Sequence, residues 1–510
     1  MTAGESLIVG TLCLSVLSIT PAPARDDLSA PAGVDAGLAA LRQGRFQQAG
    51  DRFSLVSRQA PRDAEGPFFE AYLSWWRLLD RTAPQEVRAL RQTMEERLAE
   101  TVKRARARLD DPDPAGRGRA MTILGTALLL DAQSKVARGA HFAAASSARQ
   151  GYEALSDVLA ADADAPDALF AMGVYNYFAD KMSVFAKGLR FLLFIPGGDA
   201  RLGLTQLENA ARRSRYFGTE SLLILSHIYS GNFEHDFTRS LEFVDRAAAR
   251  HADSPLIAML RADLLFRLGR LRESSAAAGE ALKMVRSAPG FTEDLEGLAA
   301  HRIAACALEL HDPLSAIAHV EAHLKLTTAG TPLTKRKMAT LLVSAARESG
   351  ATERALSSLD RIQLQAEELE SYRRRLRSLR PDPLAAPRAT ALQSFAQGGG
   401  QTATQAIELL LAANPTDRRL HYDYGRMLQM QGRMNDAQSH LKVAAEGETQ
   451  TRDADIAGWA LLRLGWARDA AGERALALSY YRKASQLKHF TFRAAALDLL
   501  NHPALSQPEG

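Results

Sequence analysis

The 510-residue sequence predicts an all-α fold, an α-solenoid in which pairs of antiparallel helices stack into a superhelix. The first observation behind this prediction is a repeated spacing of small and apolar residues near the C-terminus. The second is a period of 34 residues, which separates Ala403 from Ala437 and Ser240 from Ser274. The third is composition, because alanine, leucine and arginine dominate, β-branched residues are sparse, and this favours helix.

Two C-terminal stretches share the same internal spacing. Residues 7, 12, 16 and 19 positions after Gly425 are Gly432, Ala437, Leu441 and Ala444, and those after Gly465 are Gly472, Ala477, Tyr481 and Ala484. The first glycine of each set is expected inside a helix, where it costs about 1 kcal/mol relative to alanine. Close approach of a neighbouring helix is the expected compensation. The second glycine is expected in a turn, where a positive φ ends the helix.

Partial copies of this spacing occur elsewhere in the chain. One begins at Gly37 and includes Gly44 and Phe53, and a weaker one begins at Gly398. Asp199 is expected to cap the helix that starts at residue 200, because an aspartate side chain accepts hydrogen bonds from the first turn.

The repeated pattern resembles the tetratricopeptide-repeat proteins. The resemblance implies a non-catalytic scaffold that binds a protein or peptide on the extended concave surface of its stacked repeats. In such repeats the first helix of each pair lines the groove. Carried over from Gly425 and Gly465, the groove candidates are Arg419, Tyr422, Arg426, Gln429, Trp459 and Trp466. Aromatic and arginine side chains are enriched at binding hot spots, and the alternative is that the tryptophans pack against the segment after Phe490.

Chaperone-binding members of that class hold a peptide's terminal carboxylate with a lysine and an asparagine. Tyr422 and Arg426 occupy those two positions in this sequence, so the resemblance does not extend to that activity.

Residues 1–24 are expected to be an export signal. An apolar run from Leu7 to Thr20 precedes the small-residue pattern at Ala22–Ala24. The segment before the run carries Glu5 and no lysine or arginine, which is unusual for such a signal. Export would place the protein in the bacterial periplasm or at the cell envelope.

The best internal boundary lies after the charged stretch that ends at Arg380. Pro381, Pro383 and Pro387 follow, and then comes Gly398. The sequence therefore predicts a helical-repeat block at 28–380 and a second, tetratricopeptide-repeat block at 388–495.

Two other modes of binding stay open at the level of sequence. The apolar segment 185–195 would suit a membrane-peripheral scaffold, or it is the buried face of a long repeat. The basic runs Arg104–Arg108 and Arg373–Arg380 would suit nucleic acid, or they are solvated helix ends. The net charge of +4 is small for this length, so nucleic acid is not expected as a partner.

No catalytic residue, cofactor or metal is expected. The sequence has only Cys13 and Cys306, which excludes a disulfide framework and a cysteine-rich zinc site. His319 and His323 are four residues apart, but no third ligand is identifiable beside them, so surface histidines are the preferred interpretation.

Overall fold

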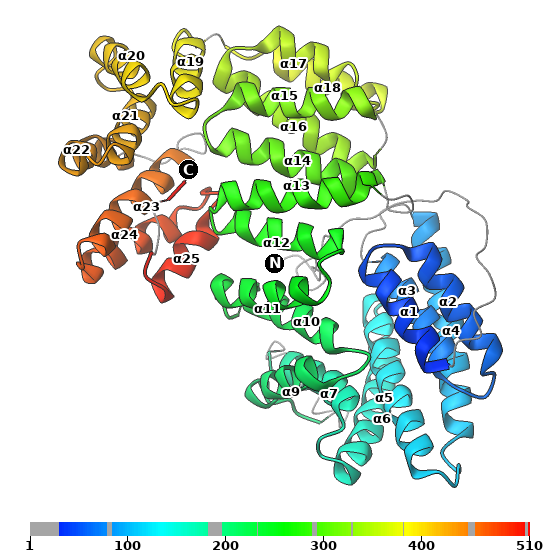
Figure 1. Cartoon of the computed structure of the whole chain (residues 1–510). Helices are drawn as coiled ribbons and strands as arrows, with labels where there is room; N and C mark the ends of the chain where they lie inside the picture. Colours follow the sequence, from blue (N-terminus) through cyan, green and yellow to red (C-terminus); the bar gives the residue numbers. More distant parts are fainter. Residues whose placement is uncertain are drawn as a thin grey trace. The chain divides into compact units, whose positions relative to one another are not determined.

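A computed structural model describes residues 30–78, 84–181, 196–231, 233–287, 293–327, 330–380, 382–446, 454–504 and 508–509. Twenty-four helices and no strand lie in these ranges, which confirms the all-α prediction (Figure 1). The predicted export signal at 1–24 and the apolar segment 185–195 lie outside the described residues.

The described residues form two compact units, and the first contains those up to Ile228 together with Glu242–Ile257. Its helices are α1 (Ala30–Arg42), α2 (Phe46–Gln59), α3 (Glu65–Leu78), α4 (Pro84–Ala107), α5 (Pro114–Ala137), α6 (His141–Ala161), α7 (Pro166–Asp180), α9 (Ala200–Arg213) and most of α10 (Gly218–Ser230). Consecutive helices pack as antiparallel neighbours, for example α1 with α2, α3 with α4 and α5 with α6.

The second unit contains Tyr229–Leu241, Ala258–Ser287 and the described residues from 293 onwards. Its helices are most of α12 (Pro255–Arg267), then α13 (Leu271–Ser287), α14 (Glu293–Glu309), α15 (Pro313–Leu326), α16 (Pro332–Ser349), α17 (Thr352–Leu359), α18 (Ala366–Arg377), α19 (Ala385–Ala396), α20 (Gly400–Ala413), α21 (Arg418–Met430), α22 (Met434–Ala445), α23 (Ala454–Ala470), α24 (Arg474–Gln486) and α25 (Arg493–Asn501). Helix α11 (Phe237–Arg250) is divided between the units.

The division between the units passes through α10, α11 and α12. The proline-rich link at which the sequence predicts a boundary, between 380 and 388, lies inside the second unit instead. The physical reason is that α19, which follows this link, packs against α16. The prolines end a helix within this unit, although the clusters of buried apolar residues before and after them are separate.

The glycines of the repeat spacing face the residue that follows them by 16 positions. A Cβ atom on Gly425 would lie 3.0 Å from Leu441 Cγ and 3.2 Å from the Ala437 carbonyl oxygen. A Cβ on Gly465 would collide with the ring of Tyr481, and one on Gly37 with the ring of Phe53. In each pair the missing side chain lets the second helix lie close to the first, which explains why a glycine is retained inside a helix.

The turns and caps also follow the sequence. Gly432 and Gly472 have φ angles of 79° and 76°, as a helix-ending glycine requires. The Asp199 side chain accepts a hydrogen bond from the Leu202 backbone N–H at 3.0 Å, which confirms the predicted cap of α9.

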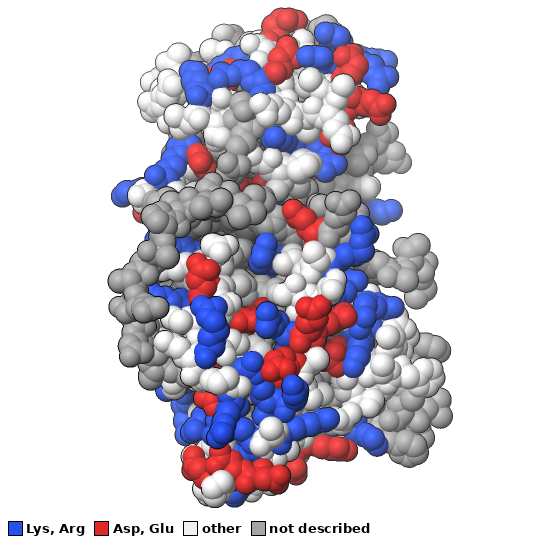
Figure 2. Space-filling model, turned by 90° about the vertical axis from the view of Figure 1, so that its right-hand side faces the viewer, with Lys and Arg blue, Asp and Glu red and all other residues white. Residues whose placement is uncertain are grey.

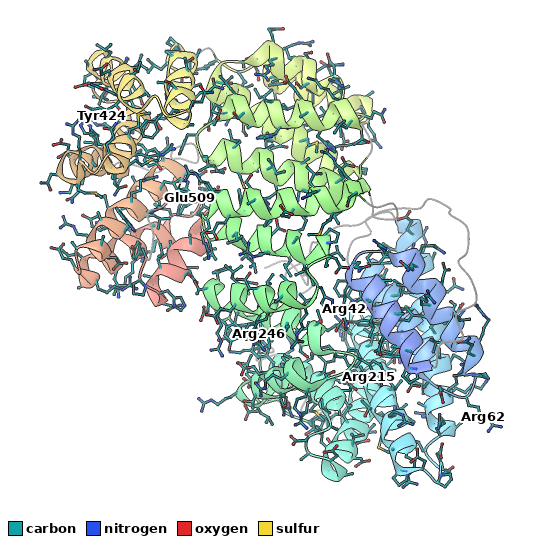
Figure 3. All side chains as sticks on the ribbon, in the orientation of Figure 1. Arg42, Arg62, Arg215, Arg246, Tyr424 and Glu509 are labelled. Atoms are coloured by element: carbon teal, nitrogen blue, oxygen red, sulfur yellow. The ribbon has the colours of Figure 1, made fainter. Side chains whose placement is uncertain are left out.

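The core of the first unit is aromatic. Phe53, Phe68, Phe69 and Phe217 are buried together, and the Phe68 and Phe69 ring centroids are 5.0 Å apart. Beside this core, Arg42 at the end of α1 (Figure 3) donates hydrogen bonds to the Glu220 carboxylate of α10 at 3.0 and 2.7 Å. A buried ion pair of this kind fixes α1 on α10, because either partner alone would be an uncompensated buried charge.

Candidate functional site

An open recess in the second unit lies between α14 and α16. These are the first helices of two successive pairs, α14–α15 and α16–α17, and they pack directly against each other. The recess has a volume of about 320 Å³, which is at the lower end of the range for ligand pockets. Its lining residues are His301, Ala305, Leu308, Glu309, Leu333, Arg336, Lys337, Thr340 and Leu341.

The spacing of the lining residues shows that one face of each helix forms the recess. Those of α14 are separated by 4, 3 and 1 residues, and those of α16 by 3, 1, 3 and 1, as on a single helical face. Ala305 lies between His301 and Glu309 on the α14 face. Because alanine leaves no side chain beyond Cβ, the helix surface is hollow at that point.

The two titratable groups that α14 contributes to the recess, His301 and Glu309, are partly buried, and burial disfavours the charged form of each. Burial, followed by the nearby carboxylates of Asp455 and Glu348, raises the pKa of Glu309 to about 8. Burial, followed by the cationic side chains of Arg302 and Lys337, lowers the pKa of His301 to about 3. The α14 wall therefore offers a protonated carboxyl group and a neutral imidazole.

The charges of the recess come from α16. Arg336 pairs with Glu368 of α18 at 3.0 Å and donates a hydrogen bond to the Pro332 carbonyl oxygen at 3.1 Å. Thr340 shares a hydrogen bond of 3.1 Å with the Tyr372 hydroxyl. Within the described part of the chain, Lys337 has no carboxylate within ion-pair distance. Lys337 is thus the cation that is available to a bound group.

Four of the six predicted groove residues are buried in the second unit. Tyr422 is 0% exposed, Arg426 6%, Gln429 2% and Trp459 2%. Arg419 and Trp466 are half-buried and keep some access to solvent. The expectation of an open groove at α21 and α23 is therefore wrong for these four residues. Of the six, a partner could reach only Arg419 and Trp466 without displacing other parts of the chain.

Contacts within the unit explain this burial. The Trp459 ring lies 4.6 Å from the ring of Phe492 and 6.0 Å from that of Phe490, so the tryptophan packs against the C-terminal segment. Arg426 donates to the Leu310 carbonyl oxygen at 3.3 Å, in the turn between α14 and α15. The face of α21 and α23 that lines a groove in an open solenoid is covered here by turns of earlier repeats.

A buried arginine holds these residues together, and the sequence analysis did not identify it. Arg463 is 0% exposed, donates to the Tyr422 hydroxyl at 3.3 Å and to Gln429 Oε1 at 2.9 Å, and accepts from Gln429 Nε2 through its carbonyl oxygen at 3.2 Å. The available signal was its position inside the apolar run of α23, where a charged residue must find internal partners.

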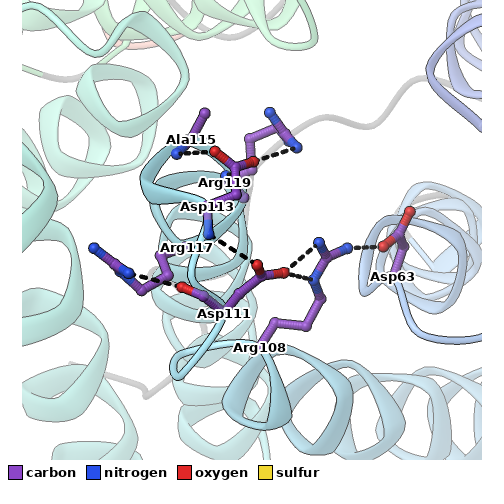
Figure 4. A network of polar contacts seen from close by, with 8 residues as sticks. Asp63, Arg108, Asp111, Asp113, Ala115, Arg117 and Arg119 are labelled. Atoms are coloured by element: carbon purple, nitrogen blue, oxygen red, sulfur yellow. Dashed lines mark hydrogen bonds and ion pairs between the residues drawn. The ribbon is translucent and has the colours of Figure 1, made fainter.

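The arginines of the basic run at Arg104–Arg108 are engaged by the protein itself. Arg108 pairs with Asp63 and with Asp111, the latter at 2.8 Å (Figure 4). Arg104 pairs with Glu100 at 2.7 Å, and Arg106 donates to the Gln150 side chain at 2.9 Å. Figure 2 shows basic and acidic side chains interspersed over the face that it presents. Neither observation favours a nucleic-acid interface there, which would need a concentrated basic surface.

Two further clusters contain histidine. His323 of α15 is buried, 3.9 Å from Glu296, which corrects the expectation of a surface histidine. Asp236, Asp498 and His502 bring one potential metal-ligating atom each to within 4.8 Å of one another. Their bonds, however, are those of a helix cap. Asp498 accepts the Thr238 N–H and O–H at 2.8 and 2.7 Å, and His502 donates to Asp236 at 3.1 Å.

Among the helices of the described ranges, none combines the length and the apolar character needed to cross a bilayer.

The stacked helix pairs and their glycine contacts define a tetratricopeptide-like helical-repeat protein with an α-solenoid fold. No protein-family model matches the sequence, and no curated protein is significantly similar to it. Solved structures with similar helical arrangements include a tetratricopeptide repeat protein from Parabacteroides merdae, with 15% identity over 55% of this chain and 98% of that chain, at a TM-score of 0.25.

Two other similar structures cover more of the chain. Yeast Tom70 has 13% identity over 84% of this chain and 94% of its own, at a TM-score of 0.29. The human IFIT1 dimer with m7Gppp-AAAA has 14% identity over 91% of each chain, at a TM-score of 0.27. Similarity at these values identifies neither a partner nor an activity.

Proposed function

We propose that this protein is a non-catalytic scaffold that binds a protein partner through the recess between α14 and α16. The observation that supports the proposal is the recess itself. Two adjacent first helices form it, it combines apolar side chains with a few polar groups, and it is large enough for one or two side chains of a partner. The surface formed by the first helices of stacked repeats is the one that solenoid proteins generally use for binding.

We further propose that the scaffold acts in the bacterial periplasm or at the cell envelope. The apolar run from Leu7 to Thr20 and the small residues at Ala22–Ala24 support export. Partners in that compartment would include assembly, secretion or cell-wall machinery.

Site-specific photo-crosslinking in the native host tests the proposed binding surface. A photo-reactive amino acid at Thr340, at the exposed rim of the recess, is expected to form a discrete crosslinked product. The matched control carries the same group at Lys325, an exposed position on the second helix α15. Equal crosslinking from both positions, or none from Thr340, would contradict a partner site at the recess.

A further inference from the structure

Lys337 is the one cation of the recess lining that lacks a carboxylate partner among the described residues. Its side chain lines the recess and is half-buried. The neighbouring cation on α16 is Arg336, whose guanidinium is already bound to Glu368 at 3.0 Å. Among the residues that the structure describes, no carboxylate neutralises Lys337. A half-buried, unpaired ammonium favours an anionic ligand group, because the attraction is less screened than in bulk water.

The opposite wall of the recess does not repel an anion. Since burial raises the pKa of Glu309 to about 8, this carboxyl group is protonated at neutral pH and can donate a hydrogen bond. His301 is neutral, because burial lowers its pKa to about 3. The only formal charges on the lining are then those of Arg336 and Lys337, and both are positive.

Apolar side chains flank the lysine. Leu333 and Leu341 lie one helical turn before and after Lys337 on the same face of α16, and Leu308 faces them from α14. Leu341 is 5% exposed and forms part of the hydrophobic core below. An apolar side chain next to the anionic one would therefore also be accommodated.

We propose that the recess recognises an acidic side chain within a partner peptide, adjacent to a bulky apolar residue. The carboxylate would pair with Lys337, the Glu309 carboxyl would donate to the peptide, and the apolar neighbour would pack on Leu308, Leu333 and Leu341. An acidic residue inside the peptide fits better than the peptide's C-terminal carboxylate. Lys337 lies beside apolar side chains, and a peptide residue before or after the acidic one can cover them. This inference rests on the proposed function and specifies its ligand.

Phage display of short random peptides tests the proposal on the full chain at neutral pH. The peptides are fused to the phage so that none has a free C-terminus. Wild-type protein is expected to enrich peptides with Asp or Glu next to Leu, Ile or Phe. Lys337→Glu is expected to weaken binding of a selected peptide, resynthesised with an amidated C-terminus, by roughly tenfold or more. Lys335→Glu, with the same charge change outside the recess lining on the same helix, is the control and is expected to bind as wild type.

The outcomes separate this inference from the proposed function. The acidic ligand would be contradicted if the enriched peptides lacked Asp and Glu. It would also be contradicted if Lys335→Glu and Lys337→Glu weakened peptide binding equally. In both cases peptide binding by the scaffold would still stand. Failure to enrich any peptide, together with absence of crosslinking from Thr340, would overturn both. The melting temperatures of the two lysine variants are expected to equal that of the wild type, which would show that a folding defect is not the cause of lost binding.

Discussion

The indole ring of Trp459, in α23, lies against Gly269 in the turn between α12 and α13. Gly269 has a φ of 72°, and a Cβ atom there would lie 2.7 Å from the ring carbon Cη2 of Trp459. Residues nearly two hundred positions apart thus share one packing contact inside the second unit. This contact explains why a tryptophan that the repeat register places on a groove is part of the core.

Trp459→Ala is expected to destabilise the protein by about 3–5 kcal/mol, because it removes a fully buried aromatic side chain and leaves a cavity beside Phe490 and Phe492. Thermal or denaturant unfolding measures the effect. Trp466→Ala is the control. Because Trp466 is only half-buried, this variant should lose clearly less free energy of unfolding than Trp459→Ala. Equal losses in both variants would show that Trp459 is not the packing residue.

The glycines of the repeat spacing give a second stability prediction. Gly465→Ala should destabilise by roughly 1–3 kcal/mol, because the new methyl group collides with the ring of Tyr481. Gly279→Ala in α13 is the matched control. A Cβ there meets nothing within 4 Å, so the better helix propensity of alanine should stabilise by up to about 1 kcal/mol. Unfolding shifts of the same sign for both would contradict the packing role of Gly465.

The sequence predicted the helix pairs and their turns well, because these depend on local spacing. Gly425, Gly432 and their copies act within one helix pair, so a regular interval is sufficient to place them. The groove residues could not be placed in this way. Tyr422 is buried beside the ring of His311, in the turn between α14 and α15. The spacing within one repeat does not show that this turn lies against α21.

The recess was missed for a related reason. Glu309 and Lys337 have the ordinary appearance of helix-surface residues in the sequence. They become special only because α14 and α16 lie side by side and bury part of their length, which shifts the pKa of Glu309.

Glu309 should make stability depend on pH. In the folded protein its pKa is about 8, against an ordinary value of 4.5, so between these values the folded state keeps a proton that the unfolded chain releases. The contribution of Glu309 to the free energy of unfolding therefore falls as pH rises from about 4.5 to about 8. Glu309→Gln, which imitates the protonated form, lacks this contribution. Its melting temperature should match wild type near pH 5 and exceed it near pH 9; a constant difference would contradict the raised pKa.

Export predicts a shorter mature chain. Protein purified from its native host should lack about the first 24 residues, because cleavage after Ala24 follows the apolar run that ends at Thr20. Intact-mass spectrometry measures this directly, and Ala22→Leu together with Ala24→Leu should block the cleavage. A mature mass that includes Met1, with fractionation into the cytoplasm, would reject export.

Arg426 separates a binding role from a structural one. It is 6% exposed, burial lowers its pKa to about 10, and its Nε and Nη1 atoms have no hydrogen-bond partner among the described residues. Its apolar stem is packed, and its charge is poorly compensated. Arg426→Met keeps the packed stem but removes the donor to the Leu310 carbonyl oxygen and a cation near the buried Asp423, so it should lower the free energy of unfolding by about 1–3 kcal/mol.

Arg426→Glu is expected to be more destabilising than Arg426→Met. It places a carboxylate beside Asp423, which is 0% exposed and has neither oxygen hydrogen-bonded within the described chain. Two buried carboxylates repel each other, so this variant should lose more than about 3 kcal/mol and fold poorly at neutral pH. Chemical denaturation of the two variants decides between the roles. If Arg426→Glu keeps full stability but loses capture of the crosslinked partner, Arg426 faces an open groove after all, and the binding surface extends from the recess to α21.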